Sequence, residues 1–146
     1  CQLVASCDLA VASEQASFMT PGVNIGLFCS TPMVAVSRNM SRKKTMEMLL
    51  TGEKISAIEA VDFGLINHCV SFDKLENKIM DLANLIVSKP LSTIKIGKEA
   101  FYKQAEMPIS EAYNFTSEVM AMNMLEIDAH EGISAFLDKR APLWQE

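Results

Sequence analysis

The segment Leu50–Ile66 reads LTGEKISAIEAVDFGLI and contains the signals for one helix end and one complete short helix. Gly52 directly follows a stretch with helical apolar spacing, and glycine at that position commonly ends a helix. Ser56 and Glu59 have the spacing of a capping box, in which each side chain accepts a hydrogen bond from the backbone N–H of the other residue. The helix that begins there is predicted to stop at Gly64.

A strand is predicted directly after Gly64, from Leu65 to Ser71. Before the segment, Ser41 is predicted to cap a helix that ends at Gly52. The residues expected on the buried face of that helix are Met46, Leu49 and Leu50. Ser30-Thr31-Pro32 predicts an earlier helix that runs to about Asn39, because a hydroxyl N-cap is followed by proline at the first helical position.

The first 26 residues combine short apolar elements with a tight turn. A helix is expected over residues 1–8, and the residues predicted on its apolar face are Leu3, Val4 and Cys7. Leu9-Ala10-Val11-Ala12, within Asp8–Ser13, is typical of a strand covered on both sides. A second short strand is predicted over Ala16–Met19 and is followed by the turn dipeptide Pro21-Gly22.

The part of the chain after the predicted strand is expected to be helical. An amphipathic helix is predicted over Asp73–Ser88 and is broken by Pro90. The further helices are predicted over Leu91–Glu106, from the Ser110 cap to Leu125, and over Asp128–Arg140. The sequence therefore predicts a mixed α/β part over residues 1–90 and an all-helical part over residues 91–146.

Composition excludes several functional classes. A net charge of −5 and a pI of about 5.1 argue against binding to nucleic acid or to an anionic membrane. No apolar run approaches the ~18 residues of a spanning helix. Cys1, Cys7, Cys29 and Cys69 lack zinc-ligand spacing and are expected to be free, buried thiols. Because the chain opens on Cys1 within an apolar segment, we expect it to be the later part of a longer chain.

The segment quoted first resembles the L-T-G-x-x-I-S-A-x-E-A-x-x-x-G-L-[IV] pattern of the crotonase family, also called the enoyl-CoA hydratase/isomerase superfamily. Three further stretches resemble the family: residues 1–12, Phe18–Gly26 and Phe136–Arg140, so that the resemblance covers the whole chain. It implies an α/β fold in which the later turns of a crotonase-like ββα spiral precede an all-helical trimerisation region. It also implies a homotrimer or hexamer.

The family resemblance implies an acyl-CoA thioester as ligand or substrate, a role in fatty acid metabolism, a mitochondrial location, and no additional cofactor. It implies that two backbone N–H groups hold the acyl carbonyl, one of them from a glycine run upstream of Cys1. Phe136 and Lys139 match a pair that approaches the adenine and phosphate of CoA, and their spacing would place them on one helix face. A core phenylalanine and a surface lysine remain an equal alternative.

Two positions depart from the family pattern. The hydratases of the family use two glutamates for proton transfer, and here the matching positions hold Gln2 and Gly22. An amide does not titrate, and glycine has no side chain, so neither residue can act as a general acid or base. The sequence therefore predicts a protein that binds an acyl-CoA thioester but is not an efficient enoyl-CoA hydratase. It would either catalyse a reaction that needs mainly oxyanion stabilisation or be a pseudoenzyme.

Other polar residues near these positions are weaker candidates. Asn24 and Leu27 are expected to face the substrate pocket together with Gln2 and Gly22, although Asn24 could instead bond to its own turn. The side chains interpreted as structural or solvent-facing are Glu14, Cys29, Ser30, His68 and His130. The methionine-rich helix around Met120 could line an acyl chain or be buried between subunits. Two other functions stay open: an active hydratase or isomerase that uses a residue outside this sequence, and a non-catalytic interaction scaffold.

Overall fold

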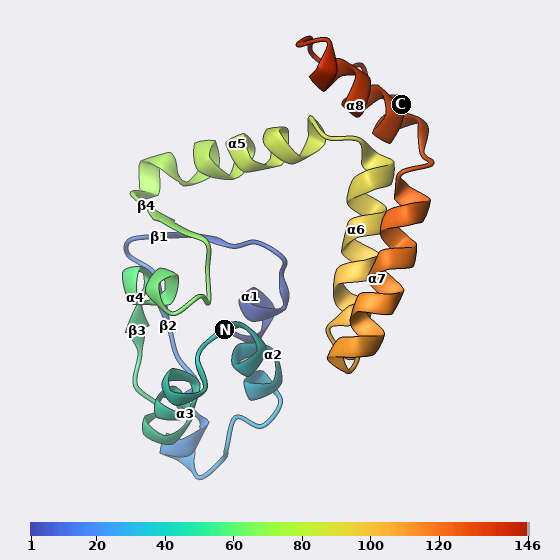
Figure 1. The fold of residues 1–146 in the computed structure, drawn as a ribbon. Helices are drawn as coiled ribbons and strands as arrows, with labels where there is room; N and C mark the ends of the chain where they lie inside the picture. The colour runs from blue at the N-terminus through green and yellow to red at the C-terminus, as the bar shows by residue number, and fades with distance from the viewer. Residues whose placement is uncertain (146) are drawn as a thin grey trace. The chain divides into compact units, whose positions relative to one another are not determined.

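The computed structural model describes residues 1–145, and it divides into two compact units, Cys1–Asp81 and Leu82–Glu146 (Figure 1). Helix α5, Leu75–Val87, runs from the first unit into the second. Pro90, where the sequence predicted a boundary, lies within the second unit.

The first unit contains the strands of the protein and several short helices. Its elements, in chain order, are α1 (Gln2–Ser6), β1 (Val11–Ser13), β2 (Ser17–Phe18), the 3₁₀ helix η1 (Pro21–Ile25), α2 (Pro32–Asn39), α3 (Arg42–Thr51), β3 (Ile55–Ser56), α4 (Ala57–Asp62), β4 (His68–Val70) and the 3₁₀ helix η2 (Phe72–Lys74). Strands β1 and β4 pair in parallel, with Val11 opposite His68. Strands β2 and β3 pair antiparallel, with Phe18 opposite Ile55. Within residues 1–145 the four strands are short and lie in two separate pairs. Strands β1, β2 and β4 lie within the three predicted strand segments, whereas β3 was not predicted.

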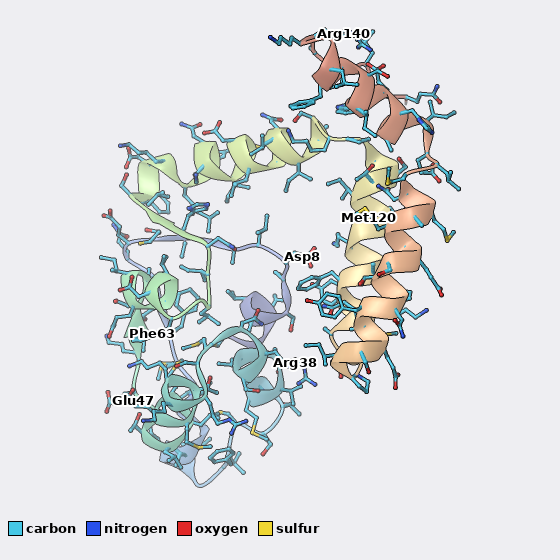
Figure 2. All side chains as sticks on the ribbon, in the orientation of Figure 1. Asp8, Arg38, Glu47, Phe63, Met120 and Arg140 are labelled. Atoms are coloured by element: carbon cyan, nitrogen blue, oxygen red, sulfur yellow. The ribbon has the colours of Figure 1, made fainter. Side chains whose placement is uncertain are left out.

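The core of the first unit lies where α1, α2, α3 and α4 meet the strands. Its fully or almost fully buried members are Val36, Met48, Ile55, Ala57, Ala60, Leu65 and Ile66. Ala57 and Ala60 are both 0% exposed. Because their side chains are small, α4 can lie close to the elements packed against it. Lys44 Nζ of α3 lies 4.8 Å from the ring centre of Phe63, which links α3 to the residue that follows α4. Within α3, Lys44 also pairs with Glu47 at 3.1 Å. Figure 2 labels Phe63 and Glu47.

The helix boundaries in the segment quoted first are confirmed. Gly52 follows α3 in the left-handed conformation, with φ of +65°. The capping box at the start of α4 is complete: the Ser56 N–H donates to Glu59 at 2.8 Å, and the Glu59 N–H donates to Ser56 Oγ at 3.2 Å. The Ser56 N–H and hydroxyl lower the pKa of Glu59. Gly64 has φ of +83° and ends the helix as predicted.

Several predicted helix faces are wrong. The buried residues of α3 are Thr45, Met48 and Leu49, whereas Met46 is 46% and Leu50 59% exposed. In α1 the buried residue is Ala5, while Leu3 and Cys7 are exposed. The reason is that the rotation of each helix follows its tertiary contacts: α1 packs against α2, where Asn39 Nδ2 donates to the Ala5 carbonyl at 2.8 Å.

Two predicted caps make no side-chain capping bond, although Thr31 does occupy the N-cap position of α2 and Pro32 begins that helix as predicted. Thr31 precedes α2 without a side-chain capping bond, and Ser30 Oγ donates instead to the Phe28 carbonyl at 3.3 Å. Ser110 lies inside α7 rather than at its N-cap, because the helix begins directly after Pro108. Ser41 does cap α3, and its Oγ accepts from the Lys44 N–H at 3.4 Å.

The second unit is helical, as expected. Helices α6 (Leu91–Gln104) and α7 (Ile109–Asn123) lie side by side as an antiparallel pair, and α8 (Ile127–Leu137) follows (Figure 1). Within residues 1–145 no strand occurs after β4. No helix in this part of the chain has the length and apolar character needed to cross a bilayer.

Candidate functional site

Gln2 is the first residue of α1 and its side chain is exposed. Its backbone carbonyl accepts a hydrogen bond from Ser6 Oγ at 2.9 Å. The position of α1 is fixed by Ala5, which is 4% exposed and bonded to Asn39 of α2. Gln2 is therefore an exposed hydrogen-bonding group on an anchored helix.

Gly22 lies in η1, which packs against α3. Its N–H donates to Cys29 Sγ at 3.3 Å, and its carbonyl accepts from the Leu27 N–H at 2.9 Å. Gly26 ends η1 in the left-handed conformation, with φ of +78°. Leu27 is 64% exposed, so the loop presents an apolar side chain at its surface.

Asn24 is exposed, and its amide lies against Gly52 at the end of α3. A Cβ atom on Gly52 would lie 2.8 Å from Asn24 Nδ2, so only glycine allows this approach. The structure thus brings Gly22, Asn24 and Leu27 together in one turn, and places Gln2 on a separate element. Thr20, just before η1, is 2% exposed, and its hydroxyl has no hydrogen-bond partner among residues 1–145.

Phe136 and Lys139 do not share a helix face, contrary to the spacing argument. Helix α8 ends at Leu137, and Lys139 has φ of +53° in the turn that follows. The Lys139 N–H donates to the Phe136 carbonyl at 3.3 Å. Phe136 is 81% exposed and, with Ile133 and Trp144, lines an apolar groove of about 580 Å³.

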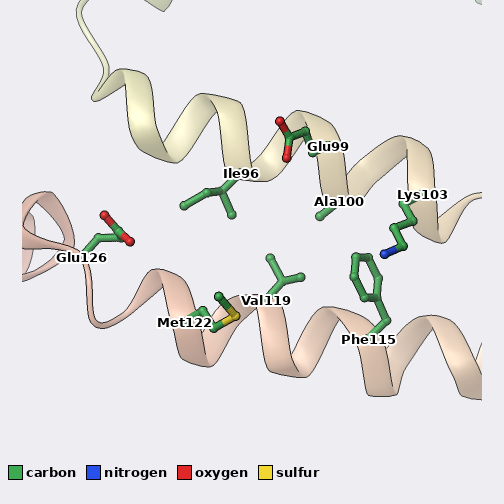
Figure 3. Close-up of a pocket in the computed structure, with 8 residues that line it drawn as sticks. All are labelled: Ile96, Glu99, Ala100, Lys103, Phe115, Val119, Met122 and Glu126. Carbon is green, nitrogen blue, oxygen red and sulfur yellow. The ribbon is translucent and has the colours of Figure 1, made fainter.

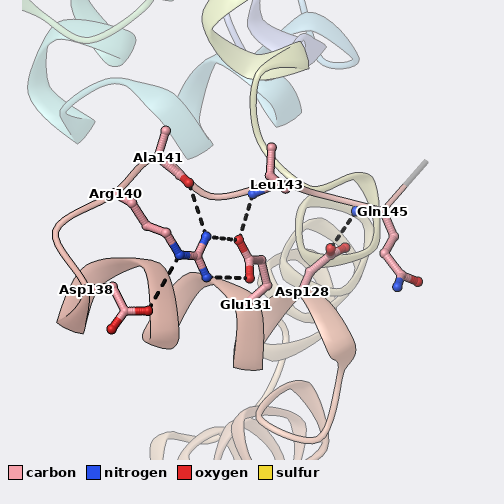
Figure 4. A network of polar contacts seen from close by, with 7 residues as sticks. All are labelled: Asp128, Glu131, Asp138, Arg140, Ala141, Leu143 and Gln145. Atoms are coloured by element: carbon pink, nitrogen blue, oxygen red, sulfur yellow. Dashed lines mark hydrogen bonds and ion pairs between the residues drawn. The ribbon is translucent and has the colours of Figure 1, made fainter.

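A polar network that the sequence did not indicate holds the chain after α8 (Figure 4). Both oxygens of Glu131 accept from Arg140, at 2.6 and 2.9 Å, and one also accepts from the Leu143 N–H at 2.8 Å. The Arg140 hydrogen bonds, followed by the Leu143 N–H, lower the pKa of Glu131 to about 2. Asp128, 8% exposed, accepts from the Gln145 N–H at 2.9 Å. These bonds fix the tail that carries Trp144.

A cavity of about 280 Å³ lies between α6 and α7 (Figure 3). Ile96, Val119 and Met122 give it apolar walls, and Lys103 Nζ lies 4.6 Å from the Phe115 ring centre at one end. Met120, Met122, Met124 and Leu125 are all more than half exposed. The predicted apolar helix therefore has unburied side chains in the single chain.

The remaining titratable candidates are partly placed as the sequence predicted, but the cysteines are not buried as expected: Cys7 is exposed and the other three are half-buried. Glu14 is exposed in the turn after β1, and His130 is exposed on α8. His68 is half-buried in β4. Cys29 is half-buried as well, and the four cysteines are free thiols. Among the described residues, no group of histidine, cysteine, aspartate or glutamate side chains is arranged to hold a metal ion.

Comparison with known proteins gives the family. Residues 1–146 match the model of the enoyl-CoA hydratase/isomerase family. The chain therefore belongs to this family, and the crotonase fold expected from the sequence is confirmed. The chain is 51% identical over 144 residues to the enoyl-CoA hydratase domain-containing protein 3, mitochondrial, of Rattus norvegicus, and equally to that of Homo sapiens. Each match covers 99% of this chain and 48% of the relative.

Solved structures agree with this result. A crystal structure of an enoyl-CoA hydratase from Mycobacterium smegmatis has a TM-score of 0.95 and is 50% identical. A crystal structure of the human enoyl-CoA hydratase domain-containing protein 3 has a TM-score of 0.93 and is also 50% identical. Each match covers 98% of this chain and 56% of the other. The chain thus spans about half the length of the relatives it matches.

Proposed function

We propose that this chain is part of a protein that binds an acyl-CoA thioester in fatty acid metabolism and is a poor enoyl-CoA hydratase. The observation that carries the proposal is the pair Gln2 and Gly22 at the two positions where the family resemblance implies glutamates. Each general acid or base contributes about 10²–10⁴-fold to a rate. With both absent, hydration should be slower than in a two-glutamate hydratase by at least about 10⁴-fold.

The fold-determining parts of the site support retained ligand binding. Helix α1 and the η1 turn are anchored to α2 and α3, so the surfaces around Gln2, Asn24 and Leu27 are preformed. Such a site can hold a thioester through backbone N–H groups without transferring a proton. The CoA thioester is then the ligand or substrate, and no further cofactor is proposed.

The test is a pair of measurements on the intact protein. Hydration of crotonyl-CoA, followed by loss of the enoyl absorbance, should be negligible, while titration with butyryl-CoA should show saturable binding. Ready turnover would favour the alternative of an active hydratase or isomerase with a residue outside this sequence. Absence of binding at millimolar ligand would favour the interaction scaffold.

Phe136 and Lys139 are proposed as CoA contacts. Phe136 offers an exposed ring beside the groove that it shares with Trp144, and Lys139 is an exposed cation two residues beyond α8. Because stacking on a base contributes about 1–3 kcal/mol, Phe136→Ala should weaken acyl-CoA binding about fivefold or more. Phe101→Ala, on α6, removes another exposed ring (62%) and serves as the matched control. Equal effects of the two substitutions would remove Phe136 from the site.

Assembly and location are proposed on different grounds. The exposed methionines of α7 are more apolar surface than a soluble monomer usually leaves open, which supports a homotrimer or hexamer. Sedimentation of the intact protein tests this, and a monomer would contradict it. A mitochondrial location is proposed because the relatives from rat and human carry that word in their names.

A further inference from the structure

The loop from Pro21 to Cys29 closes on itself around Gly22. Both backbone polar groups of Gly22 are bonded within the loop, the N–H to Cys29 Sγ at 3.3 Å and the carbonyl to the Leu27 N–H at 2.9 Å. The left-handed conformation of Gly26 reverses the chain so that Leu27 can return to Gly22. The loop is therefore closed by one backbone contact and one thiol contact, both made by Gly22.

No space is left at position 22 for even the first atom of a side chain. A Cβ atom on Gly22 would lie 2.6 Å from the Leu27 carbonyl oxygen and 2.8 Å from Cys29 Sγ. Ordinary carbon contacts are about 3.5–4.0 Å. Gly22 does not have a positive φ, unlike Gly26, Gly52 and Gly64, so a side chain is excluded by space and not by backbone conformation.

We infer that Cys29 and the Leu27 carbonyl together close position 22 to every side chain, so that glutamate there cannot restore proton transfer. This inference rests on the proposed function and deepens it, because it concerns the same position in the η1 loop. The absence of the second glutamate then follows from the conformation of the whole loop, and substituting residue 22 alone cannot reverse it.

The two blocking atoms differ in how far they can yield. The Leu27 carbonyl belongs to the backbone and is held by the Leu27 N–H bond to Gly22, so it cannot withdraw without opening the loop. Cys29 Sγ can rotate about one bond, but the Gly22 N–H then loses its acceptor. Cys29 is thus a positioning residue that keeps the Gly22 amide in place.

The first experiment is Gly22→Ala in the intact protein. Its Tm should fall by several degrees, about 3–10 °C, because the added methyl group overlaps both blocking atoms. Gly97→Ala is the matched control: a Cβ on Gly97, within α6, meets nothing within 4 Å, and alanine favours a helix. The control should keep or raise the Tm. A Gly22→Ala protein that melts with the unaltered protein would overturn the inference.

A double-mutant cycle tests the part played by Cys29. Because Cys29→Ala removes one of the two blocking atoms, Gly22→Ala should lower the Tm less in that background than in the unaltered protein. Strictly additive changes would overturn the role of Cys29. Where Gly22→Ala alone does not fold, a Gly22→Ala/Cys29→Ala double variant that folds shows the same relief, and a double variant that stays unfolded counts against the role of Cys29.

Activity gives the third arm. Gln2→Glu alone is nearly isosteric and should leave the Tm unchanged, and Gln2→Glu with Gly22→Glu should still not hydrate crotonyl-CoA. Turnover by that double variant at an unchanged Tm would overturn the inference. Butyryl-CoA titration of the unaltered protein tests the proposed function, and absence of binding would refute it. The Tm measurements test independently whether position 22 is closed to side chains.

Discussion

Replacing Met48 by alanine should destabilise the first unit more than any other methionine substitution in α3. Met48 is 2% exposed and packs in the cluster that contains Val36 and Ile55, themselves 0% and 3% exposed. A buried Met→Ala change costs about 2–5 kcal/mol, and the cost is larger where neighbours cannot collapse into the space. The neighbours of Met48 lie in helices and strands anchored elsewhere, so we expect about 3 kcal/mol, or a Tm lower by about 6–12 °C.

Met46→Ala is the matched control, because the same side chain is removed two residues earlier in the same helix. Met46 is 46% exposed, and its truncation should cost less than about 1 kcal/mol. Urea unfolding at one protein concentration, followed by far-UV circular dichroism, gives both free energies of unfolding. Equal costs, or a larger cost for Met46, would refute the observed rotation of α3 and restore the face predicted from the sequence.

Two further predictions concern a helix end and a carboxylate. Gly52→Ala should cost about 1–2 kcal/mol of stability for the left-handed conformation, plus the cost of displacing Asn24. Gly26→Ala should cost the conformational part alone, because a Cβ there meets nothing within 4 Å. Chemical unfolding compares the two variants, and a costlier Gly26 variant would contradict this. Glu131 has a pKa lowered from 4.5 to about 2 by Arg140, so its contribution to stability is present above about pH 4.5 and is lost as the pH falls toward 2. The Tm gap between Glu131→Gln and the unaltered protein should therefore be open at neutral pH and shrink on acidification, and a gap independent of pH would contradict the pairing.

The sequence predicted where elements begin and end better than which way they face. Gly52, Ser56 and Glu59 act through contacts within a few residues, so their capping roles could be inferred without the fold. The burial of Thr45 could not be inferred from the sequence. Helix α3 packs against α2 and η1 with this threonine inward, although more hydrophobic residues of the same helix remain exposed. Hydrogen bonds between residues far apart in the sequence cannot be predicted from a local pattern.

Position 139 illustrates this limit at the candidate CoA site. Arg140 reaches back nine residues in sequence to Glu131, and the chain therefore leaves the helical path before Lys139. An i, i+3 argument assumes that the helix continues, and here it ends at Leu137. The spacing of Phe136 and Lys139 alone could not reveal the ending.

The segment that identifies the family carries information about the fold and very little about the reaction. Ala57 and Ala60 are 0% exposed, and Gly64 combines φ of +83° with a space where a Cβ would lie 2.9 Å from the Asn39 carbonyl oxygen. Any chain with this fold needs small residues there, whatever its chemistry. The proposed loss of proton transfer concerns Gln2 and Gly22, which lie on α1 and η1, outside that segment. A chain can therefore meet every packing requirement of the family while its loop at Gly22 leaves no room for a second glutamate. For this reason binding of an acyl-CoA and hydration of an enoyl-CoA must be measured as two separate properties.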